Sequence, residues 1–276
     1  MTSELAIYDV EDRSTKTVLV TDRLIEAPNW TPDGRTLIVN GDGRLFRVEL
    51  NKPELSVIDT NFATALNNDH GVSPDGKTVV ISDASRSGES EIYTLPIGGG
   101  TPEPLGAASP AYWHGWSPDG LTLAYVARRD GAFQVCTKAA SGGDERRLTT
   151  GFDHCDGPDY TPDGRWIWFN GEIDGKVDLW RIPAQGGTPE KMTDDARVNW
   201  FPHPSPDGRL VLYLAYDAGT AGHPRDRDVE LRLMPFDGGP CETVQRFWGG
   251  QGSINVPNWA PDGRRFAFVR YEKGVS

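Results

Sequence analysis

The sequence predicts an all-β protein, a single six-bladed β-propeller with four antiparallel strands per blade that spans residues 1–276. Three observations support this fold class. The tripeptide Pro-Asp-Gly recurs six times, alternating apolar residues follow its copies, and the two chain ends each supply half of a blade. Self-similarity with a period of about 20 to 50 residues is typical of propellers and solenoids. A helical period is not sustained in any part of the sequence.

The repeat is defined by six prolines that stand 42, 44, 44, 44 and 55 residues apart. In five of the six copies, serine or threonine precedes the proline. Ser/Thr-Pro-Asp-Gly is typical of a type I turn, because proline presets φ at the second position and glycine accepts a positive φ. We therefore expect the turns to be architecture and to lie on the face opposite the functional loops. The prolines are Pro32, Pro74, Pro118, Pro162, Pro206 and Pro261.

Strand-like segments follow each turn. Residues 36–39 and 78–81 have the apolar, β-branched character of a strand, and residues 91–95 and 178–182 provide a third strand. A glycine turn and a short fourth strand then complete the blade. The expected blades are residues 22–60, 61–104, 105–149, 150–193, 194–246, and 247–276 together with 1–21.

The two ends of the chain are expected to share the sixth blade. Residues 4–19 look like the third and fourth strands of a blade, and residues 258–271 look like the first and second. Pairing the N-terminal strands with the C-terminal ones closes the ring and removes exposed sheet edges, which invite aggregation.

Charge and hydropathy restrict the partners. A net charge of −12, with no dense run of Lys or Arg, argues against nucleic acid and against an anionic membrane surface. The sequence lacks an apolar run near the roughly 18 residues of a membrane helix, so no membrane insertion is expected. The first 20 residues do not resemble a secretory signal, which predicts a cytoplasmic location, or a periplasmic one if a signal has been removed. We expect the partner to be a protein or a small polar ligand.

The repeat cores, such as residues 116–120, resemble those of the TolB-like propellers, which also occur in prolyl-oligopeptidase-type peptidases. The resemblance covers nearly the whole chain and implies the propeller fold, without implying an activity. TolB proper is periplasmic and carries an N-terminal α/β domain that is not seen in this sequence. The peptidases carry a Gly-x-Ser-x-Gly nucleophile elbow, which this sequence also lacks.

A candidate site follows from the repeat. The first strand of each blade lines the channel of a propeller, and we expect that strand to begin six residues before each repeat proline. Equivalent blades would place these six positions in a ring at one mouth of the channel. Four of the five histidines lie within eight residues before a repeat turn. The candidate ligand-binding residues of the channel mouth are Glu26, Asn68, His70, Tyr112, Trp113, His114, His154, Asp156, Asn199, Trp200, His203 and Asn255.

Three interpretations of this group are open. Polar side chains at a wet channel mouth can simply bind water and neighbouring loops. Alternatively, Tyr112, Trp113 and Trp200 can anchor a ligand or a segment of a partner, as aromatic residues do at interface hot spots. The third interpretation is a metal site, because carboxylate and amide oxygens suit Ca²⁺ or another divalent cation. The candidate metal ligands are Glu26, Asn68, Asp156 and Asn255.

The metal interpretation rests on two resemblances. The segments 26–28 and 156–158 are similar to the metal-binding strands of the senescence-marker and gluconolactonase propellers. That resemblance implies a divalent-metal-dependent lactonase or hydrolase. The histidines are similar to those of oligogalacturonate lyases, which implies a uronate lyase with a transition metal. The histidines in question are His70, His114, His154 and His203.

The fifth repeat is 11 residues longer than its neighbours, and the excess falls in residues 217–228, between the second and third strands. We expect this loop on the same side as the polar ring, although His223 within it is expected at the surface without a partner. The leading hypothesis is a non-enzymatic scaffold that binds a protein or small ligand through the channel mouth and this loop. The metal-dependent enzyme is the alternative.

Overall fold

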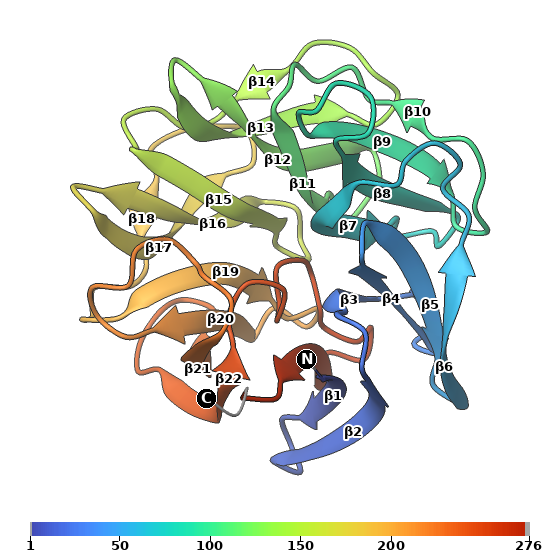
Figure 1. Cartoon of the computed structure of the whole chain (residues 1–276). Coiled ribbons are helices and arrows are strands. Elements are labelled where there is room, and N and C mark those ends of the chain that lie inside the picture. Colours follow the sequence, from blue (N-terminus) through green and yellow to red (C-terminus); the bar gives the residue numbers. More distant parts are fainter. Residues whose placement is uncertain (1, 274–276) are drawn as a thin grey trace.

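The computed structural model describes residues 2–273, which form six β-sheets arranged around a central axis (Figure 1). Five sheets have four antiparallel strands and the sixth has three. All 23 strands assigned in these residues belong to blades, and no helix is assigned among them. The predicted six-bladed propeller is confirmed.

The strands run outwards from the axis within each of the first five blades. Blade 1 contains β3 (Glu26–Trp30), β4 (Thr36–Gly41), β5 (Arg44–Glu49) and β6 (Lys52–Ile58). Blade 2 contains β7 (Leu66–Val72), β8 (Thr78–Asp83), β9 (Glu91–Pro96) and β10 (Glu103–Pro104). Blade 3 contains β11 (Ala111–Trp116), β12 (Thr122–Arg129), β13 (Ala132–Ala139) and β14 (Arg146–Arg147).

The later blades repeat this pattern. Blade 4 contains β15 (His154–Tyr160), β16 (Trp166–Ile173), β17 (Lys176–Pro183) and β18 (Glu190–Lys191). Blade 5 contains β19 (Val198–Pro204), β20 (Leu210–Tyr216), β21 (Arg227–Pro235) and β22 (Glu242–Gly249), so its last strand continues past residue 246. Blade 6 contains β23 (Arg265–Tyr271), β1 (Ser3–Asp9) and β2 (Ser14–Thr21).

The second strand of each blade is apolar on both faces because blades pack against it from both sides. In β4, Leu37 and Val39 pack towards blade 6, whereas Ile38 between them packs towards blade 2. All three side chains are fully buried. Successive side chains of a strand point to opposite faces, so one strand contributes to two hydrophobic clusters.

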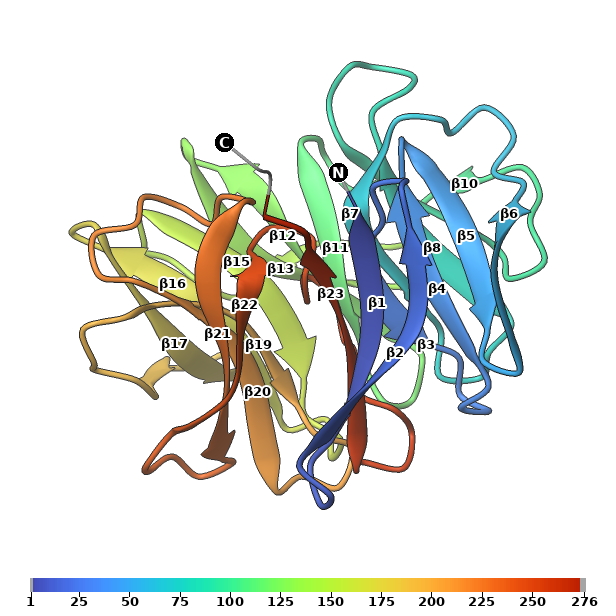
Figure 2. The ribbon, with the colours of Figure 1, turned by 60° about the horizontal axis from the view of Figure 1, so that its bottom comes forward.

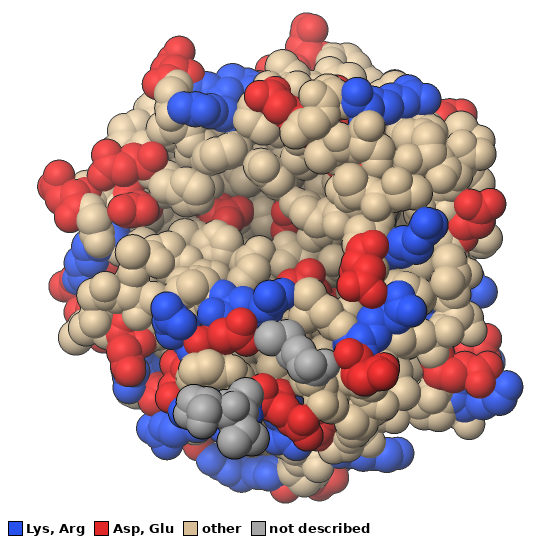
Figure 3. Space-filling model, viewed as in Figure 1, with Lys and Arg blue, Asp and Glu red and all other residues tan. Residues whose placement is uncertain are grey.

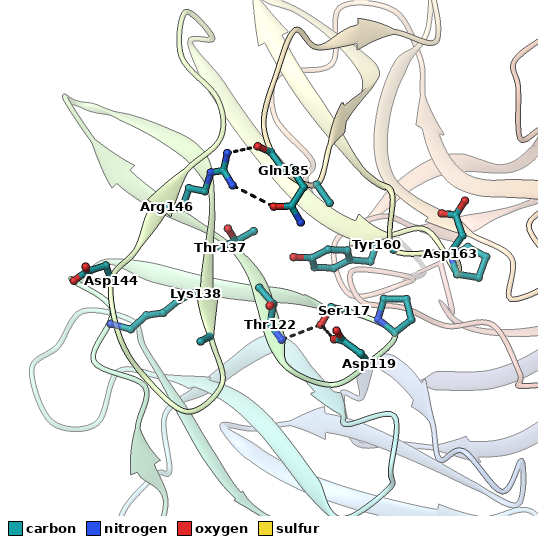
Figure 4. Close-up of a pocket in the computed structure, with 15 residues that line it drawn as sticks. Ser117, Asp119, Thr122, Thr137, Lys138, Asp144, Arg146, Tyr160, Asp163 and Gln185 are labelled. Carbon is teal, nitrogen blue, oxygen red and sulfur yellow. Dashed lines mark hydrogen bonds between the residues drawn. The ribbon is translucent and has the colours of Figure 1, made fainter.

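The Pro-Asp-Gly turns form as predicted and are held by their own side chains. In the third copy, Ser117 Oγ donates to Asp119 Oδ1 at 2.5 Å and accepts from Thr122 N at 2.8 Å (Figure 4). These hydrogen bonds explain why serine or threonine precedes the proline. The hydroxyl of Ser117 also lowers the pKa of Asp119, as expected for a carboxylate that accepts hydrogen bonds.

The chain ends close the ring. Strand β1 lies between β2 and β23, and Ser3 pairs with Tyr271 while Asp9 pairs with Arg265. Arg270 reinforces the closure through two hydrogen bonds to Glu4. Figure 2 shows the start of β1 and the end of β23 at the same face of the molecule.

Blade 6 departs from the expected regularity at its innermost position. Residues 250–258 do not form the expected first strand. A bridge between Trp259 and Phe266, with hydrogen bonds from Ala267 N to Asn258 O and from Val269 N to Ser253 O, links this part of the chain to β23. Instead the segment enters the centre of the ring, where it is visible in orange-red in Figure 1. We call residues 250–258 the central segment.

The central segment contacts several other blades. Gly252 O accepts from Ala27 N of blade 1 at 2.6 Å, and Ile254 O lies 2.6 Å from His203 Nε2 of blade 5. Asn255 O lies 3.3 Å from His114 Nδ1 of blade 3. These contacts fill the middle of the channel with protein.

Candidate functional site

The mouth cavity lies where the inner strands of blades 1 to 4 meet the central segment, and its volume is about 420 Å³. Figure 3 looks onto the corresponding face and shows acidic side chains deep in a central hollow, with basic groups at its rim. Six of the candidate residues line the cavity, together with six others. The first six are Glu26, Asn68, Tyr112, His154, Asp156 and Asn255, and the others are Asn67, Asp69, Val126, Phe133, His223 and Gln251.

Backbone bulges aim two of the acidic residues. Glu26 is followed by Ala27 at φ 53°, and Asp156 is followed by Gly157 at φ 59°. The strand register shifts at both places. A β-bulge bends a strand and redirects a side chain, so both carboxylates come from distorted rather than regular first strands.

Asp156 is surrounded by three histidines. Its Oδ1 lies 2.8 Å from His114 Nε2, and its Oδ2 lies 3.4 Å from His223 Nε2 and 4.0 Å from His154 Nε2. Burial alone would raise the pKa of Asp156, but the histidines outweigh burial and hold that pKa well below its usual range.

The same contacts determine the charge of His114. Burial favours its neutral form, but Asp69 and Asp156 outweigh burial and raise the pKa of His114 to about 9. The pKa of His154 is also raised. Burial disfavours its protonated form, but the nearby carboxylate of Asp156 outweighs burial. At neutral pH, His114 and Asp156 therefore form a buried ion pair.

Two further carboxylates, those of Asp69 and Glu26, line the cavity, and nearby positive charges offset less of their burial. Burial raises the pKa of Asp69 to about 6, and His114, whose Nδ1 lies 3.9 Å away, offsets only part of this effect. Burial also raises the pKa of Glu26. Glu26 receives a hydrogen bond from Asn40 at 3.3 Å and lies 3.9 Å from Arg225.

The insertion of the fifth blade covers part of the mouth, as expected from its position between the second and third strands. Residues 217–226 connect β20 to β21. Pro224 O accepts from Tyr216 Oη at 3.1 Å and from Gln251 N at 3.3 Å, which ties the loop to the central segment. Arg225 then reaches Glu26 across the mouth.

The expectation that His223 would lie at the surface without a partner is wrong. It is mostly buried, contacts Asp156, and forms a hydrogen bond with Gln251. Its ring lies 4.3 Å from that of Trp200. Because the residue lies in an insertion, the repeat gave it no position relative to the ring.

Aromatic rings form an arc along one wall. The ring centroids of Tyr112 and Phe133 are 5.7 Å apart, those of Phe133 and His154 are 5.5 Å apart, and those of His154 and Trp200 are 5.9 Å apart. His223 continues the arc beyond Trp200. We call these five residues the aromatic arc. The cavity thus has an aromatic side and an acidic side.

Four candidate residues lie in places of structural support. His70 is buried with its Nε2 3.3 Å from Ile38 O, and burial lowers its pKa to about 4. His203 Nδ1 lies 3.0 Å from Asp159 Oδ2. Asn199 donates to Asp195 at 3.0 Å, and Trp113 packs against Gly71 in the core.

The remaining two candidates adjoin the cavity without appearing in its lining. Trp200 is buried behind His154 and His223, and His114 is buried behind Asp156. The twelve candidates therefore lie at three depths: six line the cavity, two are buried directly behind its lining, and four support the structure elsewhere. Counting assumed regular first strands, whereas the register shifts in all five assigned first strands.

The proposed metal ligands are occupied by protein groups. Asn68 Oδ1 accepts from Gln251 at 3.2 Å and from Asn255 at 3.4 Å, and Asn255 Oδ1 accepts from Gly252 N at 2.7 Å. Within residues 2–273, no three His, Cys, Asp or Glu side chains are grouped to hold a metal ion. The four predicted histidines do not converge, because His70 and His203 bind carbonyl and carboxylate groups elsewhere. In this structure the candidate metal ligands are therefore in contact with other protein groups.

A second cavity, of about 470 Å³, lies between blades 3 and 4 beside two Pro-Asp-Gly turns (Figure 4). Its two basic side chains already have protein partners. Arg146 binds Gln185, and Lys138 donates to Gly106 O at 2.7 Å. We therefore place the candidate site at the mouth cavity rather than here.

Fold and cavity together define a closed propeller whose centre is filled and whose loops shape a single mouth cavity. The family model described as PD40, TolB beta propeller domain, matches residues 1–157 and 114–230. The chain therefore belongs to the TolB beta-propeller domain family.

Individual relatives agree with this assignment. An uncharacterised protein of Agrobacterium fabrum is 48% identical over 272 residues, which are 98% of this chain and 93% of that protein. The solved structure of a TolB-like protein from Agrobacterium tumefaciens is similar with a TM-score of 0.97, at 48% identity over 99% of both chains. The Tol-Pal system protein TolB of Francisella tularensis is 23% identical over 94% of this chain, which spans 59% of that protein.

The comparisons lend no support to the cytoplasmic location expected from the sequence. Among the residues that the structure describes, no helix is long and apolar enough to cross a membrane.

Proposed function

We propose that this chain is a binding module that holds a segment of a partner protein in the mouth cavity. The observation that carries the proposal is the division of this cavity into an aromatic side and an acidic side. Aromatic side chains supply large contact areas at interface hot spots, and fixed carboxylates select the charge and orientation of the partner. A small polar ligand is the alternative occupant.

The support around the cavity also favours binding. Hydrogen bonds fix Asn68, Gln251 and Asn255 relative to one another, so the base of the cavity is organised before a ligand arrives. Preorganised groups lose less conformational freedom on binding, which improves affinity. The similar Francisella protein is described as a component of the Tol-Pal system, which is consistent with a role in an assembly.

The proposal is tested by truncating the half-buried Tyr112 in the arc. We expect Tyr112→Ala to weaken retention of partner proteins from a native extract by about thirtyfold, because hot-spot truncations cost about 2 kcal/mol or more. The matched control is Leu121→Ala, since Leu121 lies in the turn after the third Pro-Asp-Gly and is 67% exposed. Equal retention by both variants, with unchanged melting temperatures, would contradict the proposal.

A further inference from the structure

A third cavity lies beside the mouth cavity, farther from the axis and between blades 2 and 3. Its volume is about 400 Å³, and it shares Asn67, Tyr112 and Phe133 with the mouth cavity. Ser90, Pro110 and Arg128 also line it. We call it the radial groove. The two cavities are therefore adjacent, and Asn67, Tyr112 and Phe133 lie between them.

The radial groove contains a polar group without a partner. Ser90 is 6% exposed, and within residues 2–273 its Oγ has no hydrogen-bond partner. Its backbone is fixed, since Ser90 O accepts from Ala111 N at 2.9 Å. A buried hydroxyl that lacks a partner costs free energy. Because the Oγ atom itself is buried, a backbone N–H or C=O group of a ligand would satisfy it after rotation of the Ser90 side chain.

The mouth end of this path offers a surplus carboxylate. His114 is paired with Asp156 at 2.8 Å, and Arg225 is the cation nearest to Glu26. Among the described residues, no Lys or Arg forms an ion pair with Asp69. Its carboxylate lies 3.9 Å from His114 Nδ1 and accepts a hydrogen bond from Asn67 at 2.5 Å. An ammonium group would complement Asp69 and would also be favoured beside the aromatic rings of Tyr112 and Phe133.

From these observations we infer that the mouth cavity and the radial groove form one site for an extended peptide with a free N-terminus. The α-ammonium lies against Asp69, the first side chains rest on Tyr112 and Phe133, and the following backbone meets Ser90 in the groove. This assignment rests on the proposed function and adds the direction of the peptide and the chemistry of its end. An extended chain advances about 3.3 Å per residue, so a short segment reaches from the mouth into the groove.

The test uses two pools of random hexapeptides, one with free N-termini and one N-acetylated, incubated with the full chain. Retained peptides are quantified by mass spectrometry. We expect the free pool to be retained at least tenfold better. Asp69→Asn should remove that preference, and Ser90→Ala should weaken hexapeptides about fivefold while leaving dipeptides unchanged.

The outcomes separate this inference from the proposed function. Equal retention of both pools, reduced in each by Tyr112→Ala, would overturn the inference while supporting the mouth as a binding site. If neither pool is retained but Tyr112→Ala loses its protein partners, the inference is again overturned while the mouth is supported as a binding site. A free-amine preference that persists in Asp69→Asn would also overturn it, because the ammonium would then lie elsewhere.

Discussion

At the scale of single residues, the most informative feature is the group of charges around Asp156. A carboxylate and three imidazoles meet there, although they come from blades 3 and 4 and from the blade 5 insertion. Breaking a buried ion pair by removing one partner typically costs about 3 to 5 kcal/mol. That cost arises because the remaining partner is left as an uncompensated buried charge, so the members of this group depend on one another.

This ion pair predicts a pH dependence of stability. The pKa of His114 is raised to about 9 in the folded protein, from an ordinary value of 6.5. Its contribution is therefore fully present below pH 6.5, and the free energy of unfolding should fall as pH rises from 6.5 to 9. Urea unfolding across this range tests the slope.

The matched variant for this prediction is Asp156→Asn. It removes the closest negative charge and should lower the pKa of His114, so the slope between pH 6.5 and 9 should flatten. Parallel slopes for the two proteins would mean that another group is responsible.

The bulge after Asp156 allows a second residue-scale prediction. Gly157 has φ 59°, and a Cβ there would meet Asn170 Oδ1 and Phe201 Cδ1 at 3.0 Å. We expect Gly157→Ala to lower the free energy of unfolding by about 2 kcal/mol, from backbone strain and crowding together.

A suitable control is Gly175→Ala, because Gly175 has φ 75° but open space around its Cβ position. It should cost about 1 kcal/mol from strain alone. Measured by chemical denaturation, a loss in Gly157→Ala no larger than in Gly175→Ala would show that the bulge tolerates a side chain.

Counting from the repeat placed some candidate residues at the cavity but left Trp200 buried behind its lining. Glu26, Asn68, Tyr112 and Asp156 were found by counting back from the prolines, and all four line the cavity. His223 lies in an insertion outside the repeat, so counting could not place it. Phe133 lies on a third strand, and no feature of the repeat directed attention to it.

At the scale of elements, the turns and most strands followed from local chemistry. Ser/Thr-Pro-Asp-Gly specifies a turn through its own hydrogen bonds, and the apolar runs specify strands that are buried on both faces. The central segment did not follow from the sequence. Counting placed Asn255 on a first strand, whereas residues 250–258 form no strand, keep two backbone hydrogen bonds to β23 and also contact other blades.

We expect the side chain of Asn255 to stabilise the central segment against local opening. Its side chain accepts from Gly252 N at 2.7 Å and lies 3.4 Å from Asn68 Oδ1. Without it, Gly252 N is left buried and unpaired, which costs about 1 to 3 kcal/mol. Asn255→Ala should therefore speed hydrogen exchange of amides in residues 250–258 by at least tenfold, as read by mass spectrometry.

The rest of the protein provides the internal reference for that experiment. Amides of β16, in blade 4, should exchange at unchanged rates if the effect is local. A uniform change across all blades would instead indicate that Asn255 contributes to global stability alone.

At the scale of the whole molecule, the repeat count was enough to predict the fold. Six turns count six blades, and the half-blades at the chain ends predict the closure that β1 and β23 provide. The blades then bring residues from β3, β7, β11 and β15 to one cavity. The depth of each side chain depends on bulges and on the central segment, which the repeat does not encode.

On the scale of the whole propeller, we propose that partners bind at the mouth rather than at the face of the Pro-Asp-Gly turns. The most direct measurement places a photo-crosslinking amino acid at Phe133, in the mouth, or at Leu121, beside a turn. We predict that a protein partner is crosslinked from position 133 in living cells and not from position 121. Crosslinking from position 121 with none from position 133 would contradict the account.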